Sequence, residues 1–180
     1  MADAAAKQSV TKARLAQLSM PTGGWSETAR RAAAERVVAM GLPERRDEYW
    51  RYTRPDTLTQ ATAASAALFD NNEPPIFGDV DRLTIVFVDG VFDAEASDDL
   101  SLEGVKIERL AEAKSDIHWA RDLYGTLEAK GQTPVARPLA ALNTAYASDG
   151  ILIHVTGKVS KPISLQYHCL LYTSPSPRDA

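Results

Sequence analysis

DGILIHVTGKVSKPISLQYH, residues 149–168, is the stretch that decides the fold. Ile151, Ile153 and Val155 recur at every second position, which is the spacing of side chains on one face of a β-strand. Pro162 stands just before a second run, at a place where a strand tolerates the missing N–H. The stretch therefore predicts two strands, over residues 151–156 and 163–167. Short strands separated by Gly and Pro turns are typical of a sandwich, a barrel or a β-helix, and their spacing alone does not choose among these folds.

Further strands are predicted upstream of this stretch. LTIVFVDGVF, which begins at Leu83, is a β-branched and aromatic run interrupted by the turn pair Asp89-Gly90. It predicts a strand over residues 83–88, and GVKIERL, residues 104–110, predicts a further short strand.

Helical spacing dominates the rest of the chain. The clearest helix is expected from Ser26, a plausible N-cap, to Met40, followed by Gly41 as its stop signal. Other apolar repeats predict helices over residues 8–18, 58–69 and 117–128 and around residues 139–146. The sequence thus indicates an α+β protein: residues 1–70 form a helical N-terminal region, residues 71–79 a linker, and residues 80–168 an α/β segment.

Composition and charge fit an ordinary globular chain. The 180 residues carry a net charge of −4, and no apolar run is long enough for a transmembrane helix or a secretion signal. We therefore expect a cytoplasmic protein that engages no membrane. Several arginines are interleaved with acidic residues, so we interpret them as a solvated helical face and expect no nucleic-acid partner; they are Arg30, Arg31, Arg36, Arg45, Arg46, Arg51 and Arg54.

The sequence contains no catalytic motif. It has no P-loop, no dinucleotide-binding glycine pattern, no nucleophile elbow and no zinc-protease motif. His118, His154 and His168 lack ligand spacing, and His118 is expected in an amphipathic helix beside Trp119. We therefore predict no catalytic, cofactor-binding or metal-ligating residue.

Two longer motifs resemble one family. GLPERRDEYWRYT, residues 41–53, resembles the N-terminal signature of SufD, a component of the SUF system of iron–sulfur cluster assembly. PLAALNTAYASDGILIHVTGKVSKPISL, residues 138–165, is similar to the segment in which that family enters its β-helix. The residues that carry this signature, to which we give structural roles, are Trp50, Arg51, Tyr52, Thr53, Leu142, Asn143, Thr144, Asp149 and Gly150. Trp50 and Tyr52 are expected to be buried packing anchors.

The resemblance implies a fold and a role. It implies that the predicted strands open a right-handed parallel β-helix, and that the protein acts as a non-catalytic scaffold with SufB-like and SufC-like partners. ATPase activity would reside in the SufC partner, and the assembled complex, rather than this chain alone, would handle the iron–sulfur cluster. The alternatives are a SufB-like paralogue and a carbohydrate-acting enzyme built on a parallel β-helix.

The C-terminal residues depart from that family. CLLYTSPSPRD, residues 169–179, resembles the translation of an adapter oligonucleotide used to prepare sequencing libraries. On this interpretation residues 169–180, including the chain's single cysteine, Cys169, are a non-native tail. The chain is then expected to be a truncated fragment that is inactive in cluster assembly on its own.

Overall fold

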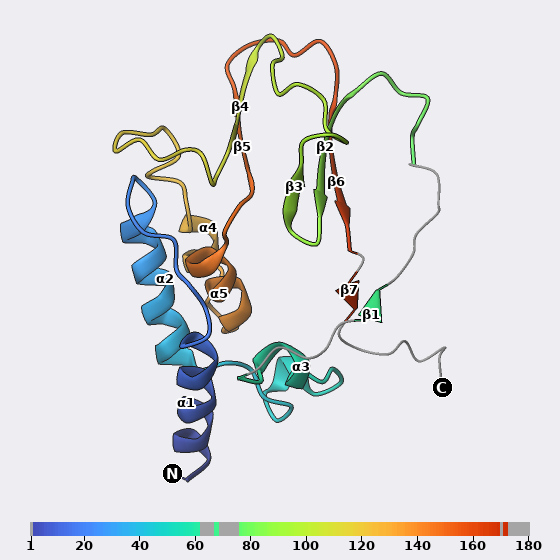
Figure 1. Cartoon of the computed structure of the whole chain (residues 1–180). Helices are drawn as coiled ribbons and strands as arrows, with labels where there is room; N and C mark the ends of the chain where they lie inside the picture. Colours follow the sequence, from blue (N-terminus) through green and yellow to red (C-terminus); the bar gives the residue numbers. More distant parts are fainter. Residues whose placement is uncertain (1, 62–66, 69–75, 170, 173–180) are drawn as a thin grey trace. The chain divides into compact units, whose positions relative to one another are not determined.

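The computed structural model describes residues 2–61, 67–68, 76–169 and 171–172 (Figure 1). Contacts divide the chain into two units. The first is built from residues 1–64 and 114–148, and the second from residues 65–113 and 149–180. The segments predicted from the sequence are continuous, whereas each unit of the structure combines two separate stretches. Residues 71–75 of the predicted linker, and residues 170 and 173–180 of the predicted tail, lie outside the described residues.

The first unit is helical. Its described elements are α1 (Ala2–Leu15), α2 (Glu27–Met40), the 3₁₀ turn η1 (Glu48–Trp50), α3 (Asp56–Thr59), α4 (Thr126–Lys130) and α5 (Pro138–Tyr146). Helix α5 packs along α2, and Figure 1 shows the two helices side by side. Distant stretches of sequence therefore build this unit.

Helix α2 has the bounds that the sequence predicts. Its buried stripe includes Ala33 and Val37, both fully inaccessible to solvent. Gly41 ends the helix with a φ of 69°, a value that favours glycine, and its N–H donates to the carbonyl of Val37 at 2.8 Å. Ser26 precedes the helix as predicted, but its hydroxyl makes no capping hydrogen bond and instead accepts one from the Arg30 Nε at 3.1 Å.

The core of this unit lies between α2 and α5. Val37, Leu42 and Ala141 form its buried centre, and partly buried hydrophobic residues surround them: Leu15, Met40, Leu139 and Leu142. Ala141 and Ala145 have no exposed surface. Small side chains on α5 thus let the two helix backbones approach closely.

The predicted helix over residues 117–128 is wrong. Residues 119–125 form turns, and only Thr126–Lys130 is helical. Gly125 has a φ of 76°, a left-handed conformation that interrupts a right-handed helix at this residue. Ile117 and Leu127, which suggested a buried stripe, are 90% and 83% exposed.

The helix predicted over residues 58–69 is contradicted at residues 60–61 and 67–68. Helix α3 ends at Thr59, and Gln60 has an extended backbone with ψ of 148°. Residues 62–66 and 69 lie outside the described part of the chain, and Ala67–Leu68 forms strand β1. The helix predicted over residues 8–18 exists as α1, but it begins and ends earlier.

The second unit consists of short strands. They are β1 (Ala67–Leu68), β2 (Leu83–Val88), β3 (Val91–Asp93), β4 (Val105–Arg109), β5 (Ile151–Val155), β6 (Ile163–His168) and β7 (Leu171–Tyr172). The strands predicted over residues 83–88, 151–156 and 163–167 are confirmed to within one residue. A continuous β-branched and aromatic run in β2, and apolar residues at alternate positions in β5 and β6, gave these strands a strong local signal.

The described strands form three small sheets. Strand β2 lies in the middle of the order β3-β2-β6, antiparallel to β3 and parallel to β6, with Leu83 opposite Ile163 and Val88 opposite His168. Strands β4 and β5 pair antiparallel, and so do β1 and β7. Leu83, Ile85 and Phe87 of β2 form the buried centre of this unit.

The fold is therefore mixed α/β, with helices followed by short strands, in agreement with the predicted class. The described strands form no β-helix, because β5 pairs antiparallel with β4 and only β6 makes a parallel pair. The predicted right-handed parallel β-helix accordingly stays a prediction.

Candidate functional site

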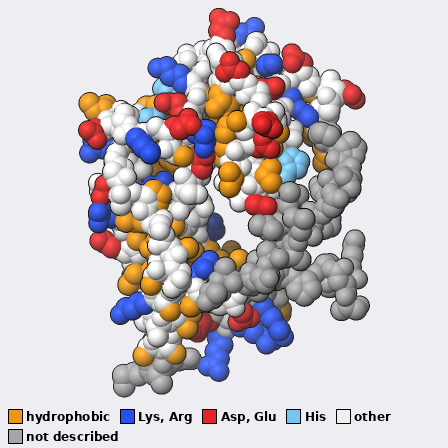
Figure 2. Space-filling model, in the orientation of Figure 1, with side chains coloured by type: hydrophobic (Ala, Val, Ile, Leu, Met, Phe, Trp, Pro, Cys, Tyr) orange, Lys and Arg blue, Asp and Glu red, His pale blue; other side chains and the backbone are white. Residues whose placement is uncertain are grey.

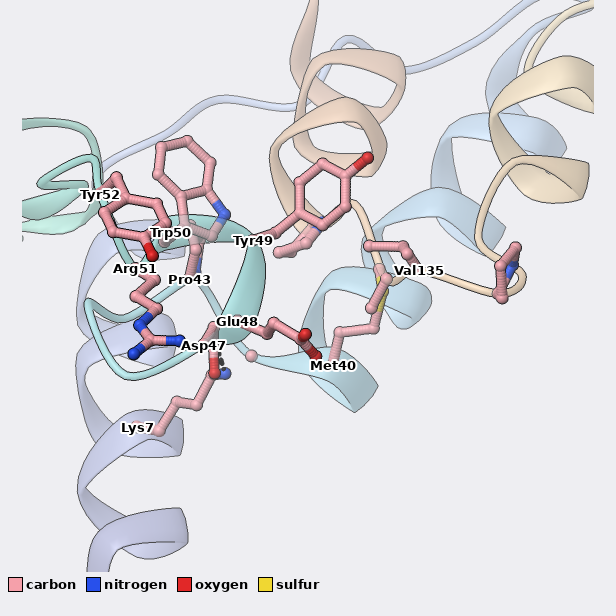
Figure 3. A pocket seen from close by; sticks show the side chains of 14 residues that line it. Lys7, Met40, Pro43, Asp47, Glu48, Tyr49, Trp50, Arg51, Tyr52 and Val135 are labelled. Carbon is pink, nitrogen blue, oxygen red and sulfur yellow. Dashed lines mark hydrogen bonds and ion pairs between the residues drawn. The ribbon is translucent and has the colours of Figure 1, made fainter.

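A cavity of about 760 Å³ lies in the first unit, beside the signature segment (Figure 3). We call it the aromatic groove. It is bounded by α1, the C-terminal end of α2, η1 and the residues that lead into α5. Its lining residues are Lys7, Met40, Gly41, Pro43, Asp47, Glu48, Tyr49, Trp50, Arg51, Tyr52, Pro134, Val135, Ala136 and Pro138. A volume of this size is typical of ligand-binding clefts.

Buried polar contacts hold the turn after α2 against α1. The N–H of Leu42 donates to the Thr11 hydroxyl at 2.9 Å, and that hydroxyl donates to the carbonyl of Lys7 at 2.8 Å. Thr11 and Leu42 are both buried. These contacts fix the point from which the chain enters η1.

An ion pair holds the start of η1. The Lys7 Nζ lies 2.8 Å from the Asp47 Oδ2, which also accepts a hydrogen bond from the N–H of Glu44 at 3.0 Å. Burial alone would raise the pKa of Asp47, but the hydrogen bonds from Lys7 and Glu44 and the charge of Lys7 together lower the pKa below its ordinary value. The carboxylate is therefore charged and engaged at neutral pH.

Three aromatic side chains form one wall of the groove, and Figure 3 shows them on and just after η1. Tyr49 is 66% exposed, Tyr52 is 92% exposed, and Trp50 is half-buried. The expectation that Tyr52 is a buried anchor is wrong, because the turn that follows η1 leaves its ring at the surface. The Arg51 guanidinium lies 5.6 Å from the centre of the Tyr52 ring, and the N–H of Thr53 donates to the carbonyl of Trp50 at 3.1 Å.

The α5 part of the signature has packing roles. Leu142 packs against the core between α2 and α5, and Asn143 is exposed. The carbonyl of Thr144 accepts a hydrogen bond from the Tyr124 hydroxyl at 2.8 Å. None of these three side chains lines the aromatic groove.

Asp149 and Gly150 belong to the second unit, where they stabilise the segment that precedes β5. The Asp149 carboxylate accepts hydrogen bonds from the N–H groups of Gly150 at 2.8 Å and Ala111 at 3.1 Å, and from the Arg109 Nε at 3.1 Å. The hydrogen bond with Asp149 is the largest cause of a raised pKa at Arg109. Asp149 thus ties the start of β5 to the end of β4. Of the nine residues that carry the signature, Trp50, Arg51 and Tyr52 line the groove.

Arg30 is the residue that the sequence interpretation most clearly misplaced. It is 2% exposed rather than solvated, and its Nη1 donates to the carbonyls of Ala145 at 3.2 Å and Ala147 at 2.8 Å. Burial lowers the pKa of this guanidinium. Its position three residues before Ala33 and seven before Val37 on α2 was the available signal that it shares their buried face.

His118 has a different environment from the one predicted. It lies outside any helix, and its ring stacks on buried Trp25 with ring centres 4.5 Å apart. The His118 Nδ1 accepts a hydrogen bond from the N–H of Ala120 at 3.1 Å. This cluster packs a loop against the start of α2.

The chemistry of the groove is that of a binding surface. It offers aromatic rings, prolines and the ion pair between Lys7 and Asp47. Within the described ranges, no three His, Cys, Asp or Glu side chains are grouped so that they would hold a metal ion. In the same part of the chain, none of the helices has the length and hydropathy needed to cross a bilayer.

Comparison with known proteins identifies one family. A family model described as the SufBD protein N-terminal region matches residues 16–166. The match spans both units and includes the aromatic groove apart from Lys7. No curated protein matches the chain.

Proposed function

The chain belongs to the family of the SufBD protein N-terminal region, and from this membership we propose that it acts as a SufD-like scaffold subunit of SUF iron–sulfur cluster assembly. The family match over residues 16–166 is the observation that carries the proposal. Membership places the chain in the SUF system and implies partners within that system.

The assignment to SufD rather than SufB rests on the signature segment. Residues 46–53, RDEYWRYT, resemble the SufD signature, and Trp50, Arg51 and Tyr52 all line the aromatic groove. A segment that presents aromatic side chains to solvent is suited to contacts between proteins. This supports a role in assembly rather than one in the folding of the helical unit.

The scaffold role assigns the chemistry to the complex. The chain is non-catalytic, a SufC-like partner hydrolyses ATP, and the cluster is cargo built with a SufB-like partner in the cytoplasm. The groove lining supports this division, because its exposed aromatic side chains are suited to contacts between proteins.

A pair of chimaeras tests the proposal. Residues 16–166 replace the matching N-terminal region of a SufD in one chimaera and of a SufB in the other, and each is co-expressed with the remaining SUF subunits. The SufD chimaera should co-purify with SufB and SufC and regain the visible absorbance of an iron–sulfur cluster after reconstitution. The SufB chimaera should do neither.

Other outcomes discriminate among the alternatives. If only the SufB chimaera assembles, the chain is SufB-like. If neither chimaera assembles and the chain releases sugars from a polysaccharide, the carbohydrate-acting alternative replaces the scaffold. If neither chimaera assembles and the chain releases no sugar, the scaffold proposal is also wrong.

A further inference from the structure

The aromatic groove exposes more aromatic surface than folding of the helical unit requires. Tyr49 and Tyr52 are 66% and 92% exposed although each carries a large apolar ring. Tyr, Trp and Arg are the residue types that dominate the energetics of protein interfaces, and they stand together from Tyr49 to Tyr52. Met40, Pro43 and Val135 add apolar side chains to the same lining.

The segment around the groove has an excess of positive charge. Residues 43–54 contain four arginines, all exposed, which are Arg45, Arg46, Arg51 and Arg54. The three carboxylates in the segment are Glu44, Asp47 and Glu48, and Asp47 is already paired with Lys7. Figure 2 shows Lys and Arg side chains at the lower surface of the molecule, with Asp and Glu side chains beside them. Charge complementarity therefore favours an acidic occupant.

We propose that the aromatic groove is a docking site for an acidic, extended peptide segment of a partner protein that presents a proline or an aromatic side chain. The peptide's apolar side chain lies against Tyr49, Trp50 and Tyr52. Its carboxylates meet the exposed guanidinium groups of Arg45, Arg51 and Arg54. Aromatic-lined grooves suit extended proline-containing segments, because these segments lose little conformational entropy on binding.

The groove is pre-organised in the unbound protein. The Lys7–Asp47 ion pair and the hydrogen bond from Leu42 to Thr11 fix both ends of the turn that leads into η1. A pre-organised surface pays less ordering entropy on binding. Figure 3 shows the labelled aromatic side chains projecting from this turn, with the Lys7–Asp47 pair below them.

The Glu48 carboxylate in the lining favours a peptide over a nucleic acid. Asp47 is paired with Lys7, but Glu48 also lines the groove, and a strand with a phosphate at every nucleotide would bring negative charge close to it. A peptide spaces its acidic residues and can place a proline or aromatic residue at that position. The docking surface is an inference beyond the scaffold role, and it stands or fails independently of SUF membership.

Selection from a library of random peptides displayed on phage tests the proposal with the complete chain. Peptides retained by the wild type should be enriched in Asp and Glu together with Pro, Phe, Tyr or Trp. Enriched peptides are then synthesised with a fluorescent label, and their affinities are measured by anisotropy. Raising the salt concentration should weaken binding, because exposed charges are screened.

Two groove variants are compared with two matched controls. Tyr52→Ala and Arg51→Glu should each weaken peptide binding by roughly tenfold or more, the loss expected of a hot-spot residue. Ile117→Ala removes a side chain that is 90% exposed in the same unit and outside the groove, and Arg121→Glu reverses an exposed charge there. Both controls should bind as the wild type does. Because Tyr52 is 92% exposed, its truncation should leave the fold intact, which circular dichroism checks.

Three results would overturn the proposal. The first is the absence of saturable binding, or enrichment of basic peptides. The second is equal weakening by the groove variants and the controls. The third is tighter binding of labelled oligothymidine than of any enriched peptide, which would make the groove a site for single-stranded nucleic acid.

Discussion

Arg30 shows how one buried cation holds two helices together. Its guanidinium extends from α2 to the carbonyls of Ala145 and Ala147 at the C-terminal end of α5, where a helix has unpaired acceptors. The C-terminal end of a helix also carries partial negative charge, which a cation stabilises. The ring of Tyr124 lies 5.3 Å from the same guanidinium and adds a cation–π contact.

Replacing Arg30 should therefore destabilise the helical unit. Arg30→Met keeps much of the side-chain volume but leaves the buried carbonyl of Ala145 and the partly buried carbonyl of Ala147 without their donor. A buried acceptor without a donor costs about 1–3 kcal/mol, and the partly buried acceptor costs less because water can reach it. Urea unfolding followed by circular dichroism measures the loss. Arg31→Met is the matched control, because the Arg31 side chain is 59% exposed and its ion pair with Glu27 lies at the surface. Equal midpoints for the two variants would contradict the role assigned to Arg30.

The Lys7–Asp47 pair predicts a dependence of stability on pH. The folded-state pKa of Asp47 is lowered, so the charged carboxylate stabilises the fold above its ordinary pKa of 3.8. That contribution is lost as the pH falls through the lower, folded-state pKa. The wild type should thus be more stable than Asp47→Asn at neutral pH, and the difference should shrink below pH 3.8.

Thermal unfolding at a series of pH values measures this difference. Asp122→Asn, which removes an exposed carboxylate of the same unit, is the control and should show a smaller difference at neutral pH. A gap between the wild type and Asp47→Asn that widens in acid would have the wrong sign for this ion pair.

At the scale of elements, the contact between α2 and α5 depends on small side chains. Ala141 is fully buried within the core of the helical unit, whereas its neighbour Ala140 is exposed on the same helix. Ala141→Leu should cost about 1–3 kcal/mol, because the added atoms have no space between the closely packed helices. Ala140→Leu adds the same atoms at the exposed position and should be nearly neutral. Chemical denaturation of both variants checks the contrast, and a neutral Ala141→Leu would mean that α2 and α5 are not closely packed.

Elements with a strong local signal were predictable from the sequence. Helix α2 ends where Gly41 follows its apolar stripe, and β2 and β6 are continuous β-branched or alternating runs. The helix predicted across residues 117–128 failed because its apolar spacing was genuine while Gly125 takes a left-handed conformation, which spacing does not reveal. Tertiary contacts, rather than the local apolar spacing, therefore determine the conformation of this segment.

The site was predictable only in part. The signature segment around Trp50 stands out in the sequence by its density of aromatic residues. Its groove needs Lys7, which is 40 residues before Asp47, and Val135, which comes from the approach to α5. Such long-range neighbours leave no local pattern, so the sequence indicated the segment and not the cavity. The exposure of Tyr52 was likewise not predictable, because it depends on the turn that follows η1.

At the scale of the whole molecule, each unit is completed by a later segment of the chain that packs against an earlier one. Helix α5 comes back to pack on α2 in the first unit, and β6 comes back to pair with β2 in the second. The core of the second unit, around Leu83, Ile85 and Phe87, is covered by Ile151 and Ile163 from the returning stretch. Neither unit is therefore complete until the segment after residue 113 has been added.

This arrangement predicts that damage to one core stays within its unit. Phe87 is 1% exposed and stacks on Tyr167 with ring centres 5.3 Å apart, so Phe87→Ala should cost about 3–5 kcal/mol in the second unit. Hydrogen exchange followed by mass spectrometry should then show lost amide protection in β2 and β6, and retained protection in α2 and α5. Phe77→Ala, which truncates a ring that is 75% exposed, is the control and should change neither set of amides. Equal loss of protection in α2 would show that the two units unfold as one.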